Sequence, residues 1–472
     1  MNAASAGSFT PPAPQGLLSR RLELFAFEHQ KWLPWIHAAM FVAFLVLIVV
    51  PLMLPAPPDG ARLFSNFTLT ANFLIWGLWF PLVFVSVIFT GRSWCGVLCP
   101  MGASSEWVNR VGLKRAVPRW IRWEGTPVVS FIVITILAQT LDARTFPQGI
   151  ADVFGFTLAC ALLIGFLYGP GYHKRTWCRH LCPIGLTLGS FSRLGIVQFA
   201  PKMPRAGGDS WTEKGVCPTY IDVNRKRESR HCIECLRCVQ PNAKSSLAIH
   251  LRAPGSEAAA VRDHHPHSSD IWFLFLGTGT AIGGFLWLSL PQYQTLRHAL
   301  AVWAIGHDWL GFVSPGPGWL MSVHPAGREV FTWMDFSMIT GFMLATAVAF
   351  AAALSVCTGL GSWLAGRLGA DGGFRSRFLE LAYQYLPVAM VSLVLGLGSE
   401  LFAMLERGIG AAATRNLELG LFGLGLVWSL VIGRQLLQRQ GLRAGRLAVA
   451  LGPTLLGCAA AGLAWWPALF GI

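Results

Sequence analysis

Long apolar segments alternate with polar segments along most of the chain. We count nine predominantly hydrophobic segments, at 34–54, 67–90, 126–142, 151–168, 270–290, 332–357, 380–402, 418–436 and 447–470. A helix needs about 20 apolar residues to cross a hydrocarbon core of about 30 Å. The third and fourth segments are the shortest. The pattern therefore predicts an all-α polytopic membrane protein with about nine transmembrane helices.

The composition agrees with a chain surrounded by lipid. Of the 472 residues, 53% are hydrophobic and only 13% are charged. Soluble domains carry about 25% charged residues. The 20 tryptophans and 31 phenylalanines suit a bundle with aromatic belts at the membrane surfaces.

The basic residues predict the orientation. With the N-terminus inside, 31 of the 37 Lys and Arg residues fall in cytoplasmic segments, as positively charged loops prefer. We therefore expect a bacterial cytoplasmic (inner) membrane protein with a cytoplasmic N-terminus and a periplasmic C-terminus. The same bias accounts for the net charge of +14 without a nucleic-acid partner.

The spans and loops divide the chain into four parts. These are a cytoplasmic tail (1–33), a four-helix membrane unit (34–169), a cytoplasmic segment (170–268) and a five-helix membrane unit (269–472). The cytoplasmic segment is basic, so we expect it to attract an acidic carrier such as a ferredoxin or a flavodoxin. The positive-inside rule accounts for the same charge without a partner.

One cysteine motif occurs twice, each time after a span on its cytoplasmic side. Residues 94–102 read WCGVLCPMG and residues 177–185 read WCRHLCPIG, so both fit W-C-x3-C-P-x-G. The spacing places the two thiols of each motif on one face of a turn. Pro100 and Pro183 predict that a helix begins directly after each motif.

A second motif lies in the cytoplasmic segment. HCIECLRCVQPNAK (231–244) has the C-x2-C-x2-C spacing of a bacterial ferredoxin, but Asn242 stands where a fourth cysteine would be. In a two-cluster ferredoxin that fourth cysteine binds the other cluster. A single site therefore needs a remote Cys-Pro, and Cys217-Pro218 is the candidate.

Eight cysteines lie in cytoplasmic segments, which is the number that two [4Fe–4S] clusters require. We assign Cys95, Cys99, Cys178 and Cys182 to one cluster and Cys217, Cys232, Cys235 and Cys238 to the other. An exchange of one Cys-Pro between the clusters is the main alternative. Zinc is disfavoured because structural zinc sites prefer paired rather than tripled cysteines.

These motifs resemble the membrane polyferredoxin family over about residues 30–250. Its members include the quinol-dehydrogenase membrane subunit of periplasmic nitrate reductase, the nitrous-oxide-reductase regulator and the cbb-type oxidase assembly protein that reduces copper. The resemblance implies electron transfer through [4Fe–4S] clusters. The chain departs from the closest members, which have two complete ferredoxin runs.

A quinone site would need a titratable proton acceptor near the interface. On the expected outer side we single out Asp335, Glu400, His307 and His324 as quinone or proton candidates. Each also has a plain structural explanation, such as a favourable negative charge in the first turn of a helix for Asp335. Haem is not expected, because no two histidines face each other from two spans. The DHHPH stretch (263–267) is either a metal ligand set or a polar linker.

Two functions fit these features. The first is a membrane electron carrier between the quinone pool, or another membrane donor, and a redox partner. The second is an assembly or regulatory factor that supplies electrons for maturation of another metalloenzyme, for example by reducing copper. The sequence leaves open whether the protein is a quinol-linked oxidoreductase in its own right.

Overall fold

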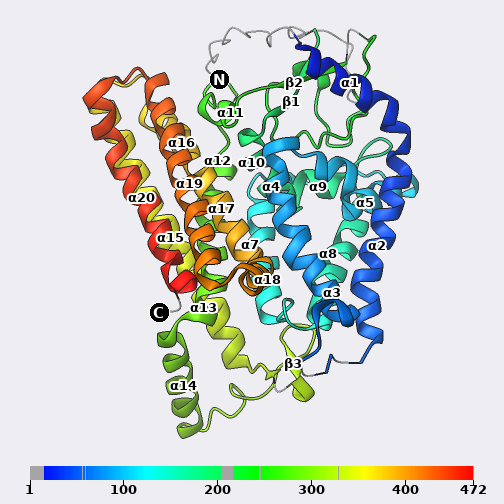
Figure 1. The fold of residues 1–472 in the computed structure, drawn as a ribbon, viewed down its shortest axis with the longest axis vertical. Helices are drawn as coiled ribbons and strands as arrows, with labels where there is room; N and C mark the ends of the chain where they lie inside the picture. Colours follow the sequence, from blue (N-terminus) through cyan, green and yellow to red (C-terminus); the bar gives the residue numbers. More distant parts are fainter. Residues whose placement is uncertain are drawn as a thin grey trace.

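The computed structural model describes residues 15–470, apart from positions 56, 59, 204–215, 244–245, 265 and 328. It is mostly helical, and eight of its helices are long and apolar enough to cross a membrane. Figure 1 shows the cysteine-bearing segments, α1 (Leu17–His29) and the small sheet at one end of the molecule, and α14 (Pro291–Gly306) at the other. The protein is therefore a multi-pass membrane protein with a polar cap at one end.

The first membrane unit surrounds the cysteine turns. Its helices are α2 (Leu33–Met53), α3 (Phe67–Asn72), α4 (Phe80–Thr90), α7 (Thr126–Thr140) and α8 (Pro147–Leu167). A π-helical stretch, Phe73–Trp79, joins α3 to α4 into one continuous span. Such stretches are rare and are often found at functional sites.

The second membrane unit contains longer helices. They are α12 (Ser268–Trp272), which continues through a π-helical stretch (Phe273–Gly277) into α13 (Thr278–Ser289), then α15 (Trp333–Arg367), α16 (Phe374–Ala382), α17 (Leu386–Leu397), α19 (Ala411–Arg439) and α20 (Ala444–Phe470). A 3-10 turn at Tyr383–Tyr385 separates α16 from α17 just before Pro387. Proline removes a backbone donor, so a break at this place is expected.

The cap consists of short elements between and beside the spans. They are α5 (Pro100–Val111), α6 (Arg119–Arg122), α9 (Thr176–His180), α10 (Pro183–Phe191), β1 (Val197–Pro201), β2 (Leu247–Leu251) and α11 (Ser256–Ala259). β1 and β2 pair antiparallel, with Phe199 opposite Ile249. A second pair, β3 (Val323–His324) and β4 (Glu329–Val330), lies at the opposite end.

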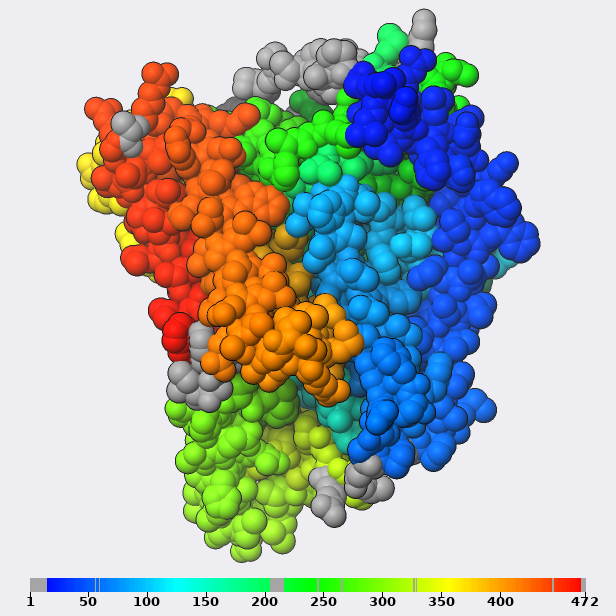
Figure 2. Space-filling view, viewed as in Figure 1, coloured from blue at the N-terminus to red at the C-terminus, as the bar shows by residue number. Residues whose placement is uncertain are grey.

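The two membrane units share one hydrophobic core. Phe84 and Phe131 of the first unit pack with Phe273, Leu393 and Phe422 of the second in a single buried cluster. Figure 2 shows the two units side by side along their length, with the region around α14 projecting at one end. The units are therefore packed together as one body.

Several sequence-based boundaries need correction. The predicted span at 126–142 forms only the 15-residue helix α7, which at 1.5 Å per residue is about 22 Å long and shorter than the membrane core. The span predicted to end at residue 402 ends at Leu397, and the separate helix α18 (Ser399–Ile409) follows. The polar tail contains α1, whose buried residues alternate with exposed apolar ones.

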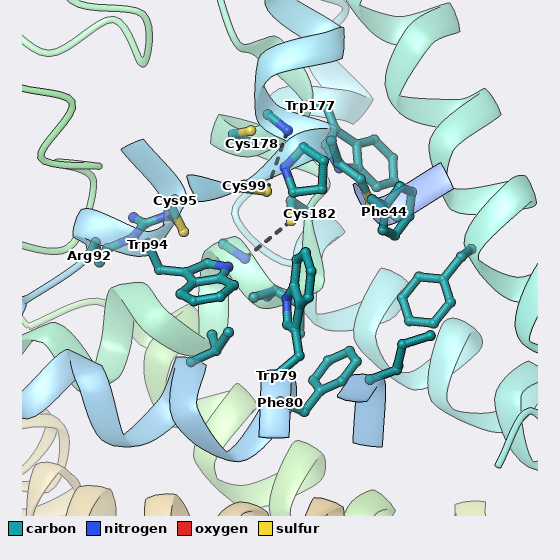
Figure 3. A pocket seen from close by; sticks show the side chains of 18 of the residues that line it. Phe44, Trp79, Phe80, Arg92, Trp94, Cys95, Cys99, Trp177, Cys178 and Cys182 are labelled. Carbon is teal, nitrogen blue, oxygen red and sulfur yellow. Dashed lines mark hydrogen bonds between the residues drawn. The ribbon is translucent and has the colours of Figure 1, made fainter. Parts of the chain in front are cut away.

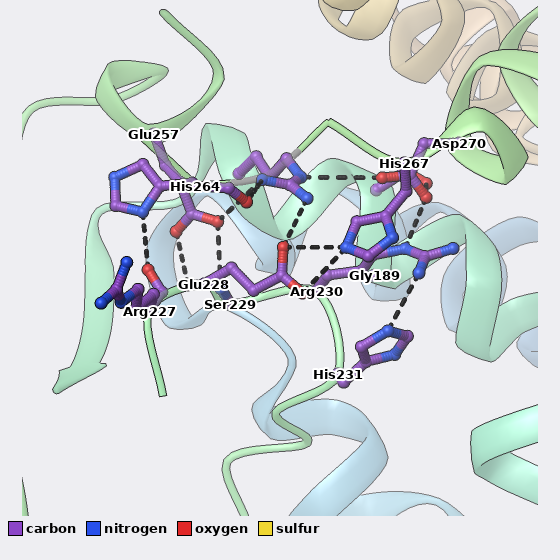
Figure 4. Close-up of polar contacts among 12 residues, drawn as sticks. Gly189, Arg227, Glu228, Ser229, Arg230, His231, Glu257, His264, His267 and Asp270 are labelled. Atoms are coloured by element: carbon purple, nitrogen blue, oxygen red, sulfur yellow. Dashed lines mark hydrogen bonds and ion pairs between the residues drawn. The ribbon is translucent and has the colours of Figure 1, made fainter. Parts of the chain in front are cut away.

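Asp270 holds the cap to the second membrane unit. Its carboxylate accepts hydrogen bonds from Arg230 Nε (2.7 Å), Ser190 Oγ (3.1 Å) and Tyr383 Oη (2.9 Å). The Arg193 guanidinium lies 3.7 Å away. Figure 4 shows Asp270 and Arg230 in this network. The Asp270 carboxylate and the nearby guanidinium groups balance one another's charge, so they can be buried together where the cap meets the second membrane unit.

We expect Asp270→Ala to destabilise the protein by about 3–5 kcal/mol, because it removes the carboxylate that pairs with the buried Arg230 guanidinium. Thermal unfolding in detergent micelles would measure the loss. Asp263→Ala is the matched control, since Asp263 forms an exposed ion pair with Arg439 (2.9 Å) worth less than about 1 kcal/mol. Equal losses in the two variants would contradict this account of the interface.

Candidate iron-sulfur sites

The two repeated cysteine motifs fold in the same way. α5 begins at Pro100 and α10 at Pro183, which confirms the predicted helix starts. In each motif the second cysteine caps the helix: Cys99 Sγ accepts from Gly102 N (3.4 Å) and Cys182 Sγ from Gly185 N (3.3 Å). Proline has no N–H at this position, where a helix would leave it unpaired in any case.

The four cysteines of these motifs line one cavity at the membrane end of the cap. Figure 3 shows Cys95, Cys99, Cys178 and Cys182 around it. Its volume is about 90 Å³, and its other walls are mostly apolar and aromatic, from Phe44, Trp79, Phe80, Trp94, Trp177 and neighbouring residues. The structure thus brings together two cysteine pairs that lie some 80 residues apart, against an apolar space.

The chemistry of this donor set fits an iron-sulfur cluster. Burial and the neighbouring Cys95 raise the pKa of the Cys99 thiol to about 11, and burial together with Cys99 and Cys95 raises the pKa of Cys182 to about 12. Four neighbouring thiolates are therefore stable only with a cation between them. Iron in a [4Fe–4S] cluster supplies that charge and takes four cysteine ligands.

The other four cysteines form a second group in the cap. Cys232 and Cys235 are buried, while Cys217 and Cys238 are half-buried and pack against the same apolar cluster as Cys232. Burial and the thiols of Cys232, Cys235 and Cys217 raise the pKa of Cys238 well above its usual value. The remote Cys217 therefore lies with the triplet.

The backbone of the triplet adopts the left-handed conformation at two positions. Glu234 and Leu236, which lie between the cysteines, have positive φ angles of 52° and 64°. Non-glycine residues rarely adopt this conformation, and where they do the surrounding structure holds them in place. β2 completes the site, since Leu247 N donates to Cys238 O (2.9 Å).

The two cysteine groups touch at Gly96. A Cβ atom on Gly96 would lie 2.2 Å from Ile233 O and 2.6 Å from Cys235 N. Only glycine lets the first motif approach the ferredoxin loop this closely. A second link lies nearby, where Arg175 N donates to Pro218 O (2.9 Å). The residue next to Cys95 is therefore in contact with the backbone of Cys235.

The four proposed quinone or proton residues are placed apart. Asp335 caps α15 through Thr332 and pairs with Arg297 at 2.5 Å. The exposed His307 bonds to Trp303 O, and His324 stacks on Phe146 at 4.2 Å beside a separate cavity. Glu400 lies in α18. Among the described residues these four make no hydrogen bond or ion pair with one another, so their role in quinone chemistry stays a prediction.

The DHHPH stretch does meet two other ligand-type residues. One potential ligand atom from each of His267, Glu228 and His231 lies within 4.8 Å of the other two, and Figure 4 shows the three side chains; His265 is outside the described residues. However, Arg230 Nη1 lies 2.9 Å from His231 Nε2, and Arg193 Nη2 donates to Glu228 at 2.8 Å. These guanidinium groups hydrogen-bond His231 and Glu228 and place positive charge beside the cluster, which disfavours a cation there.

The cysteine motifs did not identify the buried polar residues Arg175 and Glu106 or the contact at Gly96. Arg175 and Glu106 form a buried ion pair (2.9 Å) between the two groups, and Gly96 is their point of contact. The available signal was the repeat itself: an arginine stands three residues before the first cysteine of each motif, at Arg92 and Arg175.

Comparison with known proteins places the motifs in a family. A family model described as a 4Fe-4S binding domain matches residues 72–119 and 153–202, which include both C-x3-C-P turns. It does not extend to the ferredoxin triplet. No solved structure matches the chain.

The relatives are distant and share only part of the chain. The ferredoxin-type protein NapH of Haemophilus influenzae is 26% identical over 36% of this chain and 66% of its own length. Protein NirI of Paracoccus denitrificans is 27% identical over 35% of this chain and 26% of its own. The regulatory protein NosR of Pseudomonas aeruginosa is 24% identical over 34% of this chain and 26% of its own length.

The chain therefore spans between about a quarter and two thirds of these relatives, and they cover about a third of it. The shared part includes the turns that carry Cys95, Cys99, Cys178 and Cys182. Through this 4Fe-4S binding region and the helices around it, the chain is similar to membrane proteins of the polyferredoxin type.

Proposed function

We propose that the protein carries electrons between the quinone pool and a redox partner at the cytoplasmic face, through two [4Fe–4S] clusters. One cluster is held by Cys95, Cys99, Cys178 and Cys182, and the other by Cys217, Cys232, Cys235 and Cys238. The contact of the two groups at Gly96 is the observation that carries the proposal. Clusters held on either side of one backbone contact are close enough to exchange electrons directly.

An apolar cavity supports a membrane-side donor. A cavity of about 160 Å³ lies between the two membrane units and shares Cys182, Ile184 and Phe80 with the first cysteine cavity. Its walls are mostly apolar, and its polar groups include Gln139 and Arg144. An apolar chamber with a few polar groups suits an isoprenoid quinone, whose ring carries two carbonyl oxygens.

Charge supports the orientation and the partner. The cysteine cap carries most of the basic residues, and basic segments prefer the cytoplasmic side, which supports a cytoplasmic cap on a bacterial inner membrane. A basic cap attracts an acidic partner such as a ferredoxin or a flavodoxin. The two clusters then form a short path from the membrane to that surface.

A second function is favoured by one relative. NosR is described as a regulatory protein, and the same two sites would serve an accessory factor that reduces a metal centre in another enzyme. The two functions differ in whether quinol reduces the clusters at a rate that sustains turnover.

We expect anaerobically purified protein to contain about eight iron and eight sulfide per chain, since each cubane holds four of each. Added menaquinol or ubiquinol should change the cluster signals in the EPR spectrum. Eight iron with spectra that quinol leaves unchanged would favour the accessory function. Four iron or fewer would show that the assignment of cysteines is wrong.

Filling the cavity between the membrane units should block quinol alone. Ala138 lines this cavity, so Ala138→Trp should abolish reduction by quinol and leave reduction by dithionite intact. Leu163→Trp is the matched control, because Leu163 is 56% exposed on the outside of α8. Stopped-flow absorbance of the clusters measures both. Normal quinol reduction in Ala138→Trp would place the donor elsewhere.

The contact between the sites should not tolerate a methyl group. In Gly96→Ala the new Cβ would overlap the backbone at Ile233 and Cys235, so the ferredoxin loop must move away, at a cost of about 1–3 kcal/mol. We expect weaker magnetic coupling between the two reduced clusters in EPR. Gly155→Ala is the control, since nothing lies within 4 Å of that position. Unchanged coupling in Gly96→Ala would refute the electron path.

A further inference from the structure

The repeated motif is longer than its cysteines indicate. Residues 92–102 and 175–185 both read R-x-W-C-x3-C-P-x-G, so Arg92 and Arg175 occupy equivalent positions. Both are buried, with 2% and 0% of their surface exposed. Arginine is rarely buried to this extent unless its charge is balanced.

Each arginine reaches across to the other copy of the motif. A Cβ on Gly185 would lie 3.5 Å from Arg92 Nη2, and a Cβ on Gly102 would lie 3.0 Å from Arg175 Nη1. The final glycine of each motif therefore leaves room for the arginine of its counterpart. The two guanidinium groups flank the first cysteine site in a pseudo-symmetric pair.

Both groups contact the cysteines. Arg92 Nη2 lies 3.9 Å from Cys95 Sγ, and Arg175 Nη1 donates to Cys95 O at 2.7 Å. Each also keeps a buried nitrogen, Arg92 Nε and Arg175 Nη2, for which the described residues offer no hydrogen-bond acceptor. A buried donor left without an acceptor costs about 1–3 kcal/mol, so an acceptor is expected beside the thiols.

We propose that Arg92 and Arg175 are a matched pair that donates hydrogen bonds to the cluster on Cys95, Cys99, Cys178 and Cys182 and sets its reduction potential. The inference rests on the proposed assignment of clusters. A four-cysteine cubane carries net negative charge, and hydrogen bonds and positive charge near its sulfur atoms favour the reduced state. The two repeats would thus supply ligands and charge compensation together.

Arg92 and Arg175 differ in the groups that they contact outside the first cysteine site. Arg175 is balanced by Glu106 (2.9 Å), and the same carboxylate pairs with Arg237, which lies between Cys235 and Cys238 of the second site. Arg92 instead donates to the carbonyl oxygen of Arg230. Arg175 and Glu106 should therefore act on both clusters, whereas Arg92 should act mainly on the first.

The test is an EPR-monitored redox titration of the whole chain, purified anaerobically in detergent. Arg92→Gln should lower the potential of the first cluster, and Arg175→Gln should lower both. Each shift should be at least ten-fold in the reduction equilibrium, about 59 mV for a one-electron couple. Arg92→Lys, which keeps the charge, should recover most of the shift.

We expect the opposite change in Glu106→Gln, because this substitution removes a negative charge and keeps the shape of the side chain. Both potentials should rise in this variant, a change of sign that a purely structural role would not produce. Arg110→Gln is the matched control: Arg110 lies 4.0 Å from the same carboxylate but is 49% exposed, so its loss should move neither potential appreciably.

Every outcome decides the inference. If Arg175→Gln fails to bind iron, Arg92→Gln still tests the expected fall in the potential of the first cluster. Glu106→Gln still tests the expected rise in both potentials. The proposal is overturned if Arg92→Gln binds its clusters and leaves their potentials unchanged. It is also overturned if the potentials fall in Glu106→Gln. Absence of clusters from the unmodified chain would instead refute the proposed function.

Discussion

Burial of thiols is the constraint on which the cap of this protein depends. Eight cysteines lie in two adjoining groups, and burial raises the pKa of six of these thiols, in Cys182 and Cys232 to about 12. Such groups are stable as thiolates only with a metal among them. The cap therefore has features that a cubane would need: turns that aim pairs of sulfur atoms at one space, and basic residues around that space.

Ion pairs between distant segments hold this cap in place. Glu106 joins the first motif's helix to Arg175 and Arg237, and Asp270 joins the ferredoxin segment to the second membrane unit through Arg230. Breaking a buried ion pair is far more costly than losing an exposed one, because a charge left buried without its partner is poorly solvated. The five-helix unit is in this way fixed to the iron-sulfur segment and does not merely follow it in sequence.

The sequence predicted the parts of this structure that depend on local pattern. Hydrophobic runs located the long spans, and Pro100 and Pro183 located two helix starts. It did not predict α1 or α18, since amphipathic helices beside the membrane have short and mixed apolar patterns. Nor did it identify Glu106, because a buried ion pair with Arg175, 69 residues away, leaves no trace in local spacing. The contact at Gly96 was equally hidden, since a glycine is informative only once its neighbour is known.

The central claim is that two cubanes lie on either side of Gly96, each on its own four cysteines. Electron cryo-microscopy of anaerobically purified protein in nanodiscs tests it most directly. The account predicts two cubane densities, one bound by Cys95, Cys99, Cys178 and Cys182 and the other by Cys217, Cys232, Cys235 and Cys238. A single cluster, or a cluster that takes cysteines from both groups, would contradict it.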